Sequence, residues 1–296
     1  MQHLFWNVIF PLYILITLGF LAGKIRKNPD TEVITFIVLY FLAPALVFSS
    51  FRTINISFEN IKYIIINGVI TIGGVWFLAY LFSRFFHKIR SPAFEISSAI
   101  MNIGYLGIPL VYVLLGEKAV GYAVTYMVFV TIIHFTVVIV ILNPGNLSEG
   151  LKEIFKIPLI YAVIFSLFMK NFPLPSGIEK MIKLMGDSTM PLMLITIGIK
   201  LSSMDFKDIK FGISGTVLRL ICGTFISFFV IKNFPVSLLL KKTIFIQSAL
   251  PSAILNFVLC DKFKQQPNIS ASIIFFSTVV SPVWLLFVIK LLFPLL

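Results

Sequence analysis

Apolar runs of about 20 residues recur along this chain between short charged joints, and they restrict its fold more than any other feature. A run of that length matches a helix that crosses the hydrocarbon core of a bilayer. The composition agrees, because 58% of the residues are hydrophobic and only 12% are charged. A soluble domain is nearer to about a quarter charged. The sequence therefore predicts an all-α, polytopic membrane protein.

The apolar runs place about ten expected transmembrane helices along the chain and leave no room for a sizeable soluble domain. In chain order these spans cover residues 5–23, 33–51, 61–82, 92–115, 119–142, 157–170, 181–201, 211–231, 238–260 and 270–293. The joints are short, and the longest covers residues 143–156.

The two halves of the chain resemble each other. Aligning Pro11-Leu12 with Pro158-Leu159 also aligns Pro44 with Pro191. We therefore predict a first five-helix repeat over residues 1–142, a connecting loop over 143–156 and a second repeat over 157–296. An odd number of helices makes the second copy enter the membrane from the opposite side, so the prediction is an inverted 5+5 repeat, which is typical of secondary transporters.

The net charge of +12 lies mainly in the joints. There the positive charge sets the orientation of the helices in the membrane and attracts anionic lipid headgroups. The expected partner is therefore membrane lipid and not nucleic acid. In the first half the joints that hold Lys24 and Arg84 are the most basic. The positive-inside rule then places both termini outside the cytoplasm, in a multi-pass protein of the cell (inner or plasma) membrane. The bias is weaker in the second half.

The fourth span is interrupted at its centre by Asn102, Gly104, Gly107 and Pro109. Proline lacks an N–H and its ring crowds the preceding turn, and glycine leaves the backbone uncovered. Inside a bilayer, loose backbone polar groups are tolerated only where protein or a wet cavity satisfies them. The pattern predicts a broken helix that lines a binding site. A proline kink with glycines for close packing is the alternative.

The ninth span carries a corresponding interruption, with Gln247, Ser248, Pro251, Ser252 and Asn256 at its centre. Paired interruptions in two halves are the best sequence pointer to a transport site. We therefore predict that helices four and nine cross at mid-membrane. The expected substrate-binding residues are Asn102, Gly104, Gly107, Pro109, Ser248, Pro251, Ser252 and Asn256.

Crossed half-helices present free N–H groups and positive dipole ends, which attract anions. The predicted ligand is a small organic anion, and a carboxylate is the simplest choice. Unwound carbonyls and the side chains of Asn102 and Asn256 could instead hold a proton-donating group or a cation.

Three further polar residues are candidates for a coupling ion or proton, because charge inside a membrane is costly unless it is paired or wet. They are Asp187, Gln247 and Arg219. Asp187 could equally be an N-cap at a helix break. Arg219 could balance a substrate carboxylate or pair with a carbonyl or acid. His134 is expected to be a hydrogen-bonded interior histidine, and a role in proton movement is the alternative. Both Na⁺ and H⁺ stay open as coupling ions.

The sequence carries no signature of an enzyme. Its histidines and cysteines lack metal-ligand spacing, and no phosphate-binding Gly-rich loop is followed by Lys and Ser or Thr. The sequence therefore predicts no catalytic residue, no metal and no cofactor.

The interrupted spans resemble those of the auxin efflux carrier family, which includes plant PIN-type exporters and bacterial malonate and malate permeases. The residues that carry this resemblance are Asn102, Gly107 and Pro109, the Ala-Leu-Pro at 249–251, and the seventh span from 186 to 201. The similarity covers essentially the whole chain, without the long central loop of many plant members.

The resemblance implies a scaffold of helices 1, 2, 6 and 7 and a transport domain of helices 3–5 and 8–10. Helices four and nine would cross at Pro109 and Pro251, with substrate between the domains. It also implies an elevator-type motion and often a homodimer built through the scaffold. Two hypotheses follow: a secondary carrier (ion-coupled, as in a symporter) for a small organic anion, and a passive channel or ligand-sensing module on the same scaffold.

Overall fold

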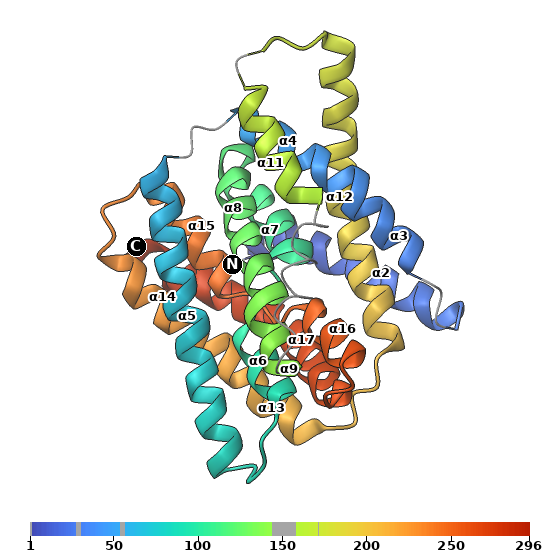
Figure 1. Ribbon diagram of the computed structural model, residues 1–296, viewed down its shortest axis with the longest axis vertical. Helices are drawn as coiled ribbons and strands as arrows, with labels where there is room; N and C mark the ends of the chain where they lie inside the picture. Colours follow the sequence, from blue (N-terminus) through green and yellow to red (C-terminus); the bar gives the residue numbers. More distant parts are fainter. Residues whose placement is uncertain (1, 28–30, 54–56, 144–157, 171) are drawn as a thin grey trace.

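The computed structural model describes residues 2–27, 31–53, 57–143, 158–170 and 172–296 (Figure 1). Within these residues the chain forms helices and no strand, apart from one isolated β-bridge. In the described part each of the ten expected spans contains helix, and seven helices are long and apolar enough to cross a membrane. The all-α, polytopic membrane fold is confirmed.

The first half begins with α1 (Gln2–Leu4), which continues through a π-helical turn (Phe5–Ile9) into α2 (Phe10–Ile25). The helices that follow are α3 (Glu32–Ile37), a π-helical turn (Val38–Leu42), α4 (Ala43–Thr53), α5 (Phe58–Phe85), α6 (Pro92–Ala99), a π-helical turn (Ile103–Gly107), α7 (Ile108–Leu115), α8 (Glu117–Ile133), a π-helical turn (His134–Val138) and α9 (Ile139–Leu142). The connecting residues 144–157 lie outside the described part.

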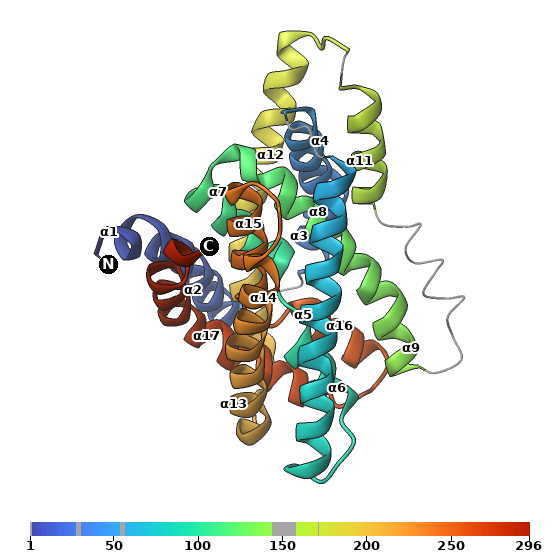
Figure 2. The ribbon, with the colours of Figure 1, turned by 90° about the vertical axis from the view of Figure 1, so that its left-hand side faces the viewer.

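The second half begins with α11 (Pro158–Phe168) and α12 (Ser176–Ser203). It continues with α13 (Ile209–Val217), a π-helical turn (Leu218–Cys222), α14 (Gly223–Lys232), α15 (Leu238–Ser248), α16 (Ile254–Lys262), α17 (Pro267–Leu291) and a 3₁₀ turn (Phe293–Leu295). Figure 2 shows α4, α11 and α12 gathered at one end of the molecule and α6 and α13 at the other.

Helices α2 and α12 pack closely because glycine lies at their contact. A Cβ at Gly198 would lie against the main chain of Ile16 and Phe20, and a Cβ at Gly19 against the carbonyl of Ile195. No other residue fits such an approach, since backbone cannot move aside. α12 also packs against α4, and α5 packs against α6 and α14.

Helix α12 is continuous through Asp187 and Pro191. A helix break at Asp187, one of the two roles considered for it, is therefore wrong. Pro191 stays inside the helix, as membrane helices allow where neighbouring groups satisfy the freed carbonyl. The inverted symmetry of the two repeats and their division into scaffold and transport domains stay predictions.

Candidate functional site

The two interrupted helices cross where their unwound segments pair with each other. Met101 and Ser252 form an antiparallel bridge. The N–H of Asn102 donates to the carbonyl of Pro251 at 2.8 Å, and the N–H of Ala253 donates to the carbonyl of Ile100 at 3.0 Å. Each interruption thus satisfies backbone groups that the other leaves free, which is what a buried membrane segment requires.

Asn256 closes the crossing from the side of α16. Its amide nitrogen donates to the carbonyl of Ile100 at 3.1 Å and to Ser252 Oγ at 3.2 Å. Its amide oxygen lies 2.9 Å from Nε2 of the buried His134. Since that oxygen can only accept, the histidine nitrogen is the donor. The expectation of a hydrogen-bonded interior histidine is confirmed.

Arg219 is fully buried beneath the crossing. Its guanidinium donates to the carbonyl of Ala99 and, at 2.9 Å, to the carbonyl of Ser248. These two carbonyls end α6 and α15, where the helix dipoles are negative. Of the two roles considered for Arg219, pairing with carbonyls is therefore the one observed. Its Nε has no partner among the described residues.

A second polar cluster lies behind the crossing and centres on Asn67 of α5. The amide oxygen of Asn67 accepts from Tyr126 at 3.1 Å and from Ser248 at 3.1 Å, and its amide nitrogen donates to Ser227 at 3.0 Å. The cluster ties α5, α8, α14 and α15 together. Sequence reasoning missed Asn67 and Tyr126. The available signal was a lone amide within the apolar run of α5.

Two amide side chains at the crossing keep free hydrogen-bonding capacity. The side chain of Asn102 makes no hydrogen bond to a described residue, although the residue is only 4% exposed. Both amide atoms of the fully buried Gln247 also lack a partner within the described part. Gln247 and Leu250 lie so close to Gly107 that a Cβ there would clash with both. Unpaired buried amides are costly, so such groups are expected where a ligand or water binds.

The remaining predicted site residues divide between the crossing and the surface. Pro109 is buried in the first turn of α7, and Gly104 lies beside the Met127 sulfur, in the turn after Asn102. Asp187 instead lies on the exposed face of α12. It makes no hydrogen bond or ion pair with the described residues, and it is not part of the crossing.

One cation lies across from the crossing. Lys200 of α12 is half-buried, and its ammonium nitrogen lies 5.8 Å from the centroid of the Tyr105 ring. Tyr105 belongs to the π-helical turn that follows Asn102. Within the described part Lys200 has no acidic partner.

Paired broken helices inside a set of membrane spans are the architecture of membrane transport proteins. The chain belongs to the membrane transport protein family, whose model matches residues 4–289. Its resemblance to the auxin efflux carriers is thereby confirmed.

Two archaeal relatives, both described as uncharacterized transporters, match nearly the whole chain. The protein of Methanocaldococcus jannaschii is 24% identical over 291 residues, which cover 93% of this chain and 94% of the relative. The protein of Methanothermobacter thermautotrophicus is 24% identical over 297 residues, which cover 92% of each chain. The chain is thus a multi-pass membrane transporter.

Proposed function

We propose that this transporter is a secondary carrier for a small organic anion, bound where the interrupted helices cross. The observation that supports this most is the position of Arg219. It holds the carbonyls that end α6 and α15, so the negative dipole ends at the crossing carry a resident cation. The positive starts of the half-helices, after Asn102 and after Ala253, have no side-chain cap among the described residues.

This imbalance favours an anion over a cation as substrate. Helix starts bind carboxylates through free N–H groups and a positive dipole end. The unpaired amide of Asn102 lies at one such start and can donate to a carboxylate oxygen. Lys200 supplies a full positive charge from the facing helix, beside Tyr105. Together these groups suit a ligand with one or two carboxylates.

In this proposal α12 faces the crossing, and the crossing moves past α12 in an elevator-type motion. Lys200 holds the substrate from one side and Asn102 from the other, so relative movement of the two helices opens the site to one face of the membrane at a time. Because Arg219 already occupies the carbonyls that a sodium ion would need, coupling to protons or no coupling is favoured over sodium at the crossing.

Counterflow in proteoliposomes tests the proposal. Vesicles loaded with unlabelled malonate, malate or indole acetate should accumulate the labelled acid transiently, because a carrier exchanges substrate and a channel or sensor does not. Asn102→Ala should slow exchange about tenfold or more, the size of a lost hydrogen bond to a charged group. Asn60→Ala, in the first turn of α5, is the matched control. Exchange at the wild-type rate in Asn102→Ala would refute the site.

A further inference from the structure

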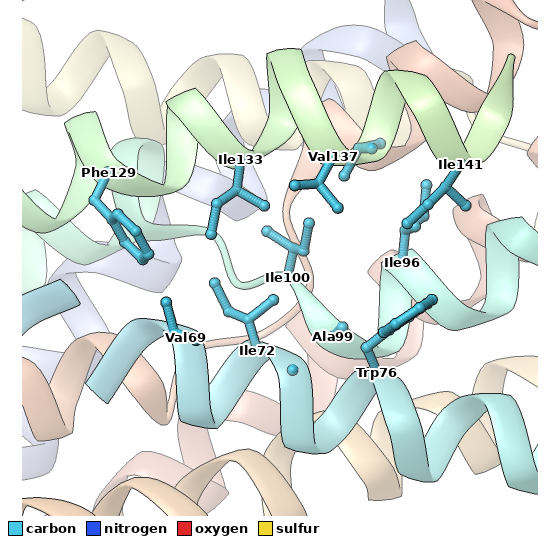
Figure 3. Close-up of a pocket in the computed structure, with 12 residues that line it drawn as sticks. Val69, Ile72, Trp76, Ile96, Ala99, Ile100, Phe129, Ile133, Val137 and Ile141 are labelled. Carbon is cyan, nitrogen blue, oxygen red and sulfur yellow. The ribbon is translucent and has the colours of Figure 1, made fainter. Parts of the chain in front are cut away.

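An apolar groove lies on the outer face of the helices that carry the crossing. Its volume is about 290 Å³, and α5, α6 and the helix from α8 to α9 form its walls. Figure 3 shows Val69, Ile72 and Trp76 of α5 opposite Ile133, Val137 and Ile141, with Ile100 between them. Ile100 belongs to the unwound segment, so the groove reaches the back of the crossing itself.

The groove opens on an exposed apolar surface, which we expect to face lipid. Val69 is 54% exposed and Val137 is 51% exposed, and both lie on helices long and apolar enough to span a membrane. The lining side chains carry no hydrogen-bonding group except the Trp76 indole, which donates to Glu95 at 3.3 Å. A polar small molecule would find nothing to orient it there, whereas an alkyl chain needs no such group.

A cluster of positive charge lies beyond one end of the groove. Arg84 lies in the last turn of α5, a little over two turns or about 12 Å of helix rise after Trp76. Lys88 and Arg90 follow in the joint, and all three are exposed. Arg90 and Arg84 act electrostatically on Glu95, the acid bonded to Trp76. Because these three cations outnumber the one buried acid, this end of the groove carries a net positive charge.

We propose that the groove is a binding site for an anionic phospholipid. One acyl chain lies between α5 and α9, against Ile100, and the phosphate lies at Arg84 and Arg90. Basic residues next to a membrane span attract anionic lipid headgroups by about 1 kcal/mol each, which is about fivefold in affinity. This site is separate from the carboxylate site, and its occupancy does not depend on the transported substrate.

Trp76 reports directly on the groove. The chain has three tryptophans, so Trp6→Phe with Trp284→Phe leaves Trp76 as the sole fluorophore. We expect phosphatidylglycerol with brominated acyl chains to quench Trp76 at a lower mole fraction than brominated phosphatidylcholine. Arg90→Gln should reduce this preference about fivefold. Unbrominated phosphatidylglycerol should restore the fluorescence by displacement.

A substitution at Gly73 can fill the groove without disturbing the packing around it. It is exposed in the groove, and a Cβ added there meets no atom within 4 Å. Gly73→Leu should therefore fill the groove without disturbing the packing and should abolish the preference for phosphatidylglycerol. Gly177→Leu, at another glycine with nothing within 4 Å, is the matched control.

Two results would overturn the proposal. The first is equal quenching by the two brominated lipids, unchanged by Gly73→Leu and not reversed by unbrominated phosphatidylglycerol. The second is a Gly73→Leu protein that loses a self-association present in the wild type, since the groove would then be a contact between copies of the chain.

Discussion

The main-chain N–H of Asn102 donates to the carbonyl of Pro251 at 2.8 Å, so the fourth and ninth membrane segments stop and restart at the same point. Pro251 lies in the break of the ninth segment, because proline cannot continue an α-helix without losing a hydrogen bond. Each half carries a break that the other half repairs. The side chain of Asn102 is not used in this repair, and it stays available to a ligand.

Arg219 should be essential for the stability of the crossing. Arg219→Met removes the donor from two buried carbonyls, and each orphaned group costs about 1–3 kcal/mol. We expect the melting temperature in detergent to fall clearly, whereas Arg26→Met, at the exposed end of α2, should leave it unchanged.

Sodium should partly restore the melting temperature of Arg219→Met and should not change that of the wild type, because only the variant has freed carbonyls that can hold the ion. Equal stabilisation of the wild type by sodium would instead place a sodium site elsewhere.

Lys200 should contribute to substrate affinity and little to folding. Lys200→Gln removes the charge beside Tyr105, and we expect KM for the transported carboxylate to rise about tenfold, in line with a lost charge-assisted contact. The maximal rate and the melting temperature should change little. Lys290→Gln, on the exposed face of α17, is the control. An unchanged KM would remove Lys200 from the site.

Gln247 should oppose stability and support transport. Both of its amide atoms are buried without a protein partner in the described part, so Gln247→Met should raise the free energy of unfolding by about 1 kcal/mol. The same change should slow exchange, because the amide faces Gly107 at the crossing. A more stable variant with full transport would show that Gln247 contacts no ligand.

His87, in the joint between α5 and α6, should make stability depend on pH. Its ring stacks on Phe211 at 4.1 Å between centroids, and Nε2 lies 3.0 Å from Ser214 Oγ. Burial and, secondly, the charge of Lys210 lower the pKa of His87 below its usual 6.5. The unfolded chain then binds the proton more readily, so stability is retained above pH 6.5 and lost as the pH falls below it.

The measurement is the melting temperature at about pH 7.5 and about pH 5. We expect the wild type to melt lower in acid and His87→Gln to reduce this difference. His3→Gln is the control, at the exposed start of the chain. A pH dependence identical in wild type and His87→Gln would exclude His87 as its source.

The helical segments and the existence of a break in each half were predictable from the sequence. The fourth span was expected over residues 92–115 with its break between Asn102 and Pro109. The structure places this break earlier, at residues 100–102, and Gly104, Gly107 and Pro109 lie in the helix that follows it. These features are local, because a run of apolar residues, a proline or a glycine acts within a turn or two of its own position.

The partners of the polar groups were decided only by the tertiary structure. Arg219 reaches Ala99 and Ser248 across long sequence separations, Asn67 collects hydroxyls from three other helices, and Asp187 lies on the exposed face of α12. A membrane helix is apolar on nearly every side, so its sequence does not say which face it turns inward. That rotation is set by packing against the other helices, and it determines which buried polar side chains meet.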